Sequence, residues 1–196
     1  GSQFTNSGVI GKPVLGTPES GDLSDADLTF PTGHIIQQQQ TVKQDTFSIA
    51  NNTNEQLITG FSRAITPIRA SSKILLSYTF ATSCDGESTA RAYMERDIAS
   101  GGYSALAGIQ GTDPGGSVGN PSLCFGGGTE NSWLQHDHGG TFLDSPSYTL
   151  GGTITYRIGL QSENGSLALH VNKTHRDSSA FHPRTAAILI LQEIAA

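Results

Sequence analysis

The chain has 196 residues, of which 24 are Gly, 22 are Ser and 20 are Thr, and only 14% are charged. Acidic residues outnumber basic ones by 17 to 11, and the resulting net charge of −6 argues against a nucleic-acid-binding surface. No apolar run approaches the roughly 18 to 20 residues that a membrane-spanning helix requires, so we expect no membrane insertion. Few residues favour helices and many are Gly or Thr, so the composition predicts an all-β protein of short strands joined by turns.

The first 33 residues differ in composition from the remainder. They contain three prolines, six glycines and only isolated apolar residues, so they cannot build a core of their own. We expect an extended N-terminal arm or the remnant of a stem, in which Gly1 and Ser2 are left over from cloning. Residues 34–196 are then expected to form one β-sandwich domain.

Strand patterns recur through this second part. The predicted strands are 32–42, 45–50, 55–66, 73–83, 153–161 and 185–194. In 73–83 and 153–161 apolar side chains alternate with polar ones, which is typical of antiparallel strands with one buried face. Segment 185–194 is apolar on both faces, which predicts a central strand that is covered on both sides and lies at a subunit interface.

The segments between these strands are harder to assign. Residues 88–99 have apolar side chains at spacings that suit a helix as well as a strand, and the closely spaced turn signals on either side favour the strand. Residues 108–128 are rich in glycine, which predicts a long loop or plug. Asn164-Gly165, with alternating patterns on both sides, predicts a hairpin over about 153–172.

Two cysteines are present, Cys84 and Cys124. Neither has a histidine or cysteine partner at the spacing of a zinc site, so the sequence implies neither a disulfide framework nor structural zinc. The sequence is compatible with two free thiols and also with a single disulfide between these two cysteines.

A series of motifs in a fixed order carries a resemblance to a known family. The motifs are Phe30-Pro31-Thr32-Gly33-His34-Ile35-Ile36-Gln37, Ser71-Ser72-Lys73-Ile74-Leu75-Leu76, Glu95-Arg96-Asp97, Phe142-Leu143-Asp144-Ser145-Pro146 and Thr155-Tyr156-Arg157. Their joint order resembles the C-terminal region of virion fibre proteins from tailed bacteriophages, particularly marine and environmental ones, over about residues 28 to 195.

The resemblance implies a β-sandwich of jelly-roll type, assembled as a homotrimer at the tip of a fibre on the virion. Such a domain contacts a glycan or protein of the host surface and is joined to other fibre or tail proteins. The resemblance brings no catalytic residues with it.

Candidate ligand residues lie where the sequence departs from this family. Trp133 is the only tryptophan, and an aromatic ring beside amides and a carboxylate is a combination that binds sugars. The expected ligand-binding residues are Asn131, Trp133, Gln135, His136, Asp137 and, on another loop, Tyr148. Packing in the core or an interface is the alternative role for Trp133.

His136 and His138 form the sharpest local motif. Residues two apart on a strand point to the same face, so both imidazoles can reach one metal ion. Three copies would supply six imidazoles on a trimer axis, an octahedral site for a transition metal. A polar strand end facing solvent is the simpler explanation, and we expect no other cofactor.

Catalysis has less support than binding. Hydrolysis of a polysaccharide requires two carboxylates about 5 to 10 Å apart. The candidate carboxylates are Asp85, Glu87, Glu130, Asp137 and Asp144. Their spacing does not pair them, and Asp144 before Ser145-Pro146 suits the start of a turn. The sequence therefore predicts a receptor-binding domain; the alternatives are a capsid decoration or baseplate component without receptor binding and, in the enzyme class, a depolymerase.

Overall fold

The computed structural model describes residues 30–49, 54–84, 89–109, 123–127, 134–162, 168–178 and 180–196. The strands are β1 (Ile35–Lys43), β2 (Phe47–Ile49), β3 (Gln56–Ile65), β4 (Lys73–Cys84), β5 (Thr89–Ile98), β6 (Tyr103–Ala105), β7 (Cys124–Gly127), β8 (His136–Asp144), β9 (Ile154–Ser162), β10 (Leu169–Val171) and β11 (Ala187–Ile194). A single turn of 3-10 helix, Ala107–Ile109, follows β6. No helix in the described ranges has the length and hydropathy needed to cross a membrane.

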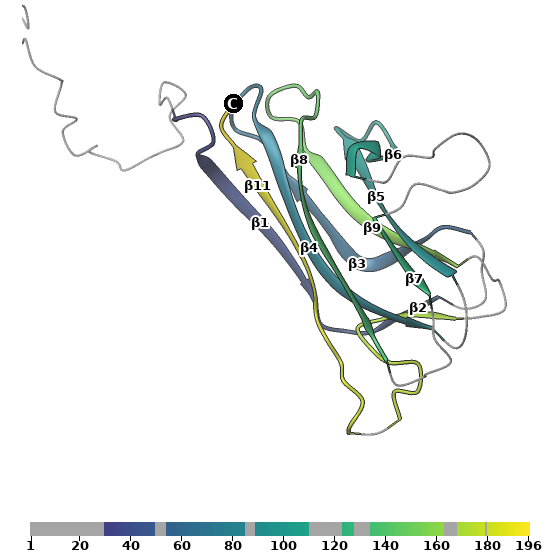
Figure 1. Ribbon diagram of the computed structural model, residues 1–196. Coiled ribbons are helices and arrows are strands. Elements are labelled where there is room, and N and C mark those ends of the chain that lie inside the picture. Colours follow the sequence, from purple (N-terminus) through teal and green to yellow (C-terminus); the bar gives the residue numbers. More distant parts are fainter. Residues whose placement is uncertain are drawn as a thin grey trace, which may run out of the picture.

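The strands form two antiparallel sheets that pack face to face (Figure 1). Sheet A has β1, β11, β4 and β8 side by side, and the short strands β10 and β2 continue it beyond the end of β11. Sheet B has the order β3, β9 and β5, with β6 and β7 both paired to β5. Because most neighbours in a sheet are distant in sequence, the chain crosses repeatedly between the sheets. This is the strand order of a jelly roll, and the predicted all-β sandwich of jelly-roll type is confirmed for the single chain.

Alternating apolar residues of the two sheets meet in the core. The predicted inward faces are confirmed for Ile74, Leu76, Tyr78 and Phe80 of β4 and for Ile154, Tyr156, Ile158 and Leu160 of β9, all of them buried. Phe61 of sheet B meets Phe80 of sheet A edge to face, with ring centroids 6.0 Å apart. The ambiguous segment 88–99 is the strand β5, as favoured.

Two predictions about connections were wrong. No hairpin spans 153–172, because β9 belongs to sheet B and β10 to sheet A. The long strand β9 has both edges occupied, by β3 and by β5, so it offers no edge to β10. The glycine-rich segment 108–128 is not wholly a loop, since β7 lies within it and pairs with β5. Residues 110–122 and the turn at 163–167 lie outside the described part of the chain.

A charged contact joins the two sheets at one end of the core. Asp144, at the end of β8, is only 5% exposed. Nη1 of Arg96 in β5 donates to its two carboxylate oxygens at 2.7 and 2.6 Å, and the hydroxyl of Tyr156 in β9 donates at 2.7 Å. Burial and the adjacent carboxylate raise the pKa of Tyr156, which keeps the phenol protonated as a donor. Asp144 therefore joins the sheets rather than starting a turn.

A second buried carboxylate fixes the connection between β3 and β4. Glu193 of β11 is fully buried and accepts hydrogen bonds from the backbone N–H groups of Ile68 and Arg69, the latter at 3.0 Å. Nε2 of Gln37 donates to the same carboxylate at 2.6 Å. Cys84, at the end of β4, is a buried thiol.

Candidate ligand-binding loop

Residues 172–186, the tip loop, connect β10 to β11 at one end of the sandwich (Figure 1). The loop starts at Asn172, whose φ of 61° lies in the left-handed region that Asn tolerates better than most residues. Its side-chain Nδ2 donates to the carbonyls of Lys43 at 2.9 Å and Asp45 at 3.2 Å, and its backbone N–H donates to the carbonyl of Ala81 at 3.0 Å. The start of the loop is thereby tied to two other segments of sheet A.

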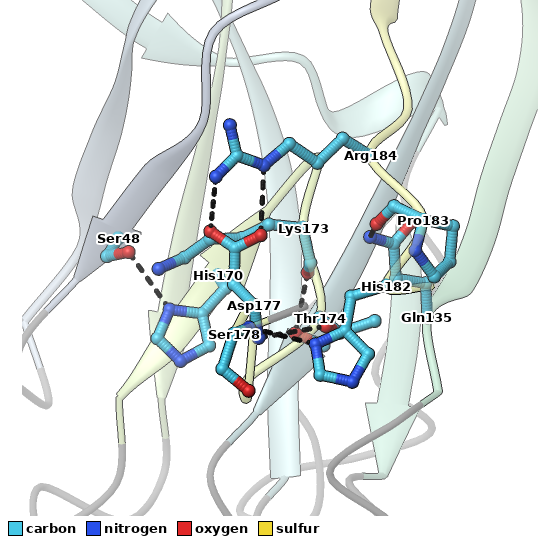
Figure 2. A network of polar contacts seen from close by, with 11 residues as sticks. Ser48, Gln135, His170, Lys173, Thr174, Asp177, Ser178, His182, Pro183 and Arg184 are labelled. Carbon is cyan, nitrogen blue, oxygen red and sulfur yellow. Dashed lines mark hydrogen bonds and ion pairs between the residues drawn. The ribbon is translucent and has the colours of Figure 1, made fainter. Parts of the chain in front are cut away.

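The far end of the loop is tied back to its start. The N–H of Thr185 donates to the carbonyl of Asn172 at 3.3 Å. From the segment before β8, Nε2 of Gln135 donates to the carbonyl of Pro183 at 2.9 Å; Figure 2 labels both residues. Oε1 of Gln135 accepts from the hydroxyl of Thr185. Gln135, predicted to contact ligand, instead uses both ends of its amide to hold the loop.

Contacts inside the loop fix its shape. Nε and Nη2 of Arg184 donate to the two oxygens of Asp177, both at 2.9 Å (Figure 2). This hydrogen-bonded pair lowers the pKa of Asp177 and raises that of Arg184. The buried residues Thr174 and His182 accept backbone N–H bonds, Thr174 from Asp177 and His182, through Nδ1, from Ser178. The loop is therefore braced from within as well as at its base.

An aromatic side chain stands at the tip of this braced loop. Phe181 is 93% exposed, the highest value among the large hydrophobic residues of the described part of the chain, and the next residue, His182, is buried. Leu134, 46% exposed, precedes the Gln135 that holds the loop. Burying a Phe side chain is worth about 2 to 3 kcal/mol, so this ring offers binding energy to a partner.

The charge of the tip loop is opposite to that of the whole chain. Its sequence has three basic residues, Lys173, Arg176 and Arg184, against one acidic residue, Asp177, which gives +2 on the loop in a chain of −6. Arg176 and Arg184 are exposed. A loop of net positive charge that carries an exposed aromatic ring suits an anionic ligand that also presents an apolar face.

The two histidines of the His136-x-His138 motif lie on the same face of β8, as predicted, but that face is turned toward sheet B. His138 pairs with the core residue Phe80, their rings 5.2 Å apart, and its Nε2 lies 2.8 Å from the hydroxyl of Thr82. Burial and the nearby His136 lower the pKa of His138, while Asp137 acts in the opposite direction. Among the described residues no three His, Cys, Asp or Glu side chains form a metal-binding group. A six-imidazole site stays a prediction, and it would need the trimer axis to meet the inward face of β8.

Of the remaining predicted ligand residues, the two that the structure describes, Asp137 and Tyr148, lie apart. Asp137 is exposed on the outward face of sheet A. Tyr148 lies beyond the opposite end of β8, where its hydroxyl donates to the carbonyls of Arg69 at 2.7 Å and Ser72 at 3.3 Å, and burial raises its pKa. Asn131 and Trp133 lie outside the described residues.

The two candidate carboxylates for hydrolysis within the described ranges are also separated. Asp137 and Asp144 are seven residues apart on β8, or about 23 Å at about 3.3 Å per residue, and a glycosidase pair needs about 5 to 10 Å. Asp85, Glu87 and Glu130 lie outside the described residues.

Sequence reasoning missed the tip loop. Its signal in the sequence is weak: one Phe within a polar segment, with no apolar neighbour at strand spacing, near Pro183 and three basic residues. Hydrophobic periodicity identifies strands, and this segment has no such periodicity. The exposure of the Phe181 ring becomes evident only from the folded structure around it.

Comparison with known proteins gives little further information. No family model matches the sequence, and no curated protein matches it. Among solved structures, one titled "CBM4 structure and function" matches with 12% sequence identity, covering 80% of this chain and 92% of that chain, at a TM-score of 0.26. At this identity and TM-score the match has no bearing on function.

Proposed function

We propose that this chain is the head domain of a bacteriophage virion fibre, and that its tip loop binds an anionic glycan of the host cell surface during adsorption. Two independent lines support the proposal. The ordered motifs between residues 28 and 195 resemble phage fibre proteins, and the tip loop has the composition and rigidity of a recognition surface. Three copies of the chain, joined as a homotrimer, would present three such loops at the end of one fibre.

The single observation that carries the proposal is the 93% exposure of Phe181 on a loop that is hydrogen-bonded at its base and within itself. An aromatic ring stacks on the apolar face of a sugar, and a loop already held in shape loses little conformational entropy on binding. Lys173 and Arg176 precede Phe181 in the same loop and would contact carboxylates, phosphates or sulfates of an acidic polysaccharide. Binding of this kind involves no turnover of the ligand.

Fluorescently labelled protein, titrated onto intact candidate host cells, tests this function. We expect saturable binding that weakens as NaCl is raised, because salt screens charge contacts. Phe181→Ala should weaken binding about 30-fold, the effect of losing about 2 kcal/mol at a central aromatic contact. Leu150→Ala is the matched control, since Leu150 is 57% exposed in the loop between β8 and β9 at the other end of the sandwich.

Three results would count against this function. They are no binding to any host cell, unchanged binding by Phe181→Ala, and an equal loss in Leu150→Ala. A folded assembly that binds no cells would favour the alternative, a decoration or baseplate component that contacts only other virion proteins.

A further inference from the structure

The outward face of sheet A has an unusual composition. Strand pairing arranges this face in three rows of four residues, which we call face A: Val42, Ile188, Thr79 and Gly139; Gln40, Ile190, Ser77 and Thr141; Gln38, Gln192, Leu75 and Leu143. None of the twelve is charged. Lys73 and Asp137 lie beyond opposite ends of the rows, and Ile35 pairs with Ile194 next to Lys73.

The outward face of sheet B is different. There the charged residues Arg91, Glu95, Asp97 and Arg157 lie partly exposed. Arg157 donates to Glu95 at 2.6 Å, and Arg91 donates from Nε to Gln161 at 2.8 Å. Such a face is typical of a surface that stays in water. The two outer faces of one sandwich therefore have different chemistry, and face A has the depletion of charge that marks the centre of protein interfaces.

Apolar side chains on and beside face A are substantially exposed. Val42 is 47% exposed, Leu143 is 45% exposed, and Ile35 at the margin is 48% exposed. Along β11 the inward residues are buried while the outward ones, Ile188 and Ile190 among them, are half-buried. No described strand packs over them, because each sheet has the other on its inner side only. Within one chain, segment 185–194 is therefore covered only on its inward face, whereas the prediction was that both faces are covered.

We infer that face A is the surface through which copies of this chain associate, with the same face of each copy turned toward the others. This inference rests on the homotrimer of the proposed function and names its interface. The net charge of the chain favours a second copy, rather than a different protein, as the partner of face A. Copies of a chain with net charge −6 repel one another, so they meet at least cost through a face that has no charge.

The pattern and extent of face A also suit self-association. Apolar positions alternate with amides and hydroxyls, and Nε2 of Gln192 already donates to Oε1 of Gln38 at 2.7 Å, so part of the amide hydrogen bonding is satisfied within one chain. Four strands about 4.8 Å apart, each contributing five residues at about 3.3 Å per residue, span roughly 300 Å² in flat projection. A typical stable interface buries about 800 Å² per partner, so face A would form the uncharged centre of a contact that continues onto its margins, where Ile35 is exposed.

The test compares masses in solution by light scattering coupled to size-exclusion chromatography. We expect the wild-type chain to have three times the 20.6 kDa mass of one chain at micromolar concentration. Val42→Glu and Leu143→Glu should each shift the mass to that of one chain, because the new carboxylate would be buried between copies. Both sites are nearly half exposed within one chain, so the charge is hydrated in the monomer and the fold is retained, which circular dichroism checks.

Leu57→Glu is the matched control. Leu57 is 40% exposed on β3 of sheet B, so the same charge is added at similar exposure on the other face, and the mass should stay at that of the wild type. The inference is overturned if the wild type is a monomer, if Val42→Glu and Leu143→Glu both keep the wild-type mass, or if Leu57→Glu dissociates the assembly. If the wild type is a dimer and both Val42→Glu and Leu143→Glu dissociate it, the interface is upheld and the trimer is refuted. Cell binding through Phe181 is measured in a separate experiment.

Discussion

Replacing Asp144 by Asn tests whether a charged contact in the core holds the two sheets together. The carboxylate accepts two bonds from Arg96 and one from Tyr156, and it is 5% exposed. An amide retains one oxygen as acceptor and turns an N–H group toward other donors. Breaking a buried ion pair on one side costs about 3 to 5 kcal/mol. Since 22% of the Arg96 side chain is exposed and can be rehydrated, we expect the lower end, about 3 kcal/mol.

Urea unfolding followed by tryptophan fluorescence and circular dichroism measures this loss. With a slope of about 2 kcal/mol per molar urea, the midpoint should fall by about 1.5 M. Tyr156→Phe removes one of the three bonds and should cost about 1.5 kcal/mol. Asp144→Leu combined with Arg96→Met removes both charges and should recover much of the loss, because no buried charge is left unpaired. The reasoning is refuted if Asp144→Asn unfolds at the wild-type midpoint at equal protein concentration.

Three other substitutions give expectations of the same kind. Because the pKa of His138 is lowered in the folded chain, the unfolded chain protonates this imidazole first as the pH falls through about 6.5. The free energy of unfolding should therefore be lower at pH 5.5 than at pH 7.5. His138→Gln should reduce this difference, measured as the difference between the urea midpoints at the two pH values. Gly159→Ala would place a Cβ 2.2 Å from the hydroxyl oxygen of Tyr93 and should cost about 2 kcal/mol, whereas in a Tyr93→Ala background it should cost almost nothing. Glu193→Gln turns an N–H group toward backbone donors and should lower stability by about 2 kcal/mol in the same assay; an unchanged midpoint would show that the carboxylate charge is not needed there.

Strands could be predicted from the sequence wherever one face is buried. In β4 and β9 the alternation is nearly complete, because each strand places every second side chain between two sheets, and the predicted bounds lie close to those observed. Pairing between strands was less predictable. The Asn-Gly turn suggested a local hairpin, but β9 is paired on both edges by strands from distant parts of the chain. Local turn chemistry cannot indicate which edges distant strands already occupy.

The candidate site was harder to predict because residue type alone does not reveal orientation. Gln135, His136 and Asp137 are adjacent in sequence, yet one holds the tip loop, one faces sheet B and one faces solvent. The sequence predicts that Tyr148 contacts ligand because it is an aromatic residue in a loop, but its hydroxyl donates to the backbone at Arg69. An alternating strand sends neighbours to opposite faces, so a cluster in sequence is dispersed in space.

The tip loop and face A can serve two functions at once because they use different parts of sheet A. The loop is anchored beyond the three rows, where the hydroxyl of Ser83 donates to the carbonyl of Lys173 at 2.8 Å and Asn172 bonds to Ala81. Copies that associate through face A would leave the cationic loops at the end of the strands in solvent. Each bound loop would then raise the effective concentration of the other two at the cell surface, so modest affinity per loop yields strong attachment. Val42→Glu should therefore weaken binding to cells much more than it weakens binding of one loop to a soluble fragment of the glycan, whereas Phe181→Ala should weaken both.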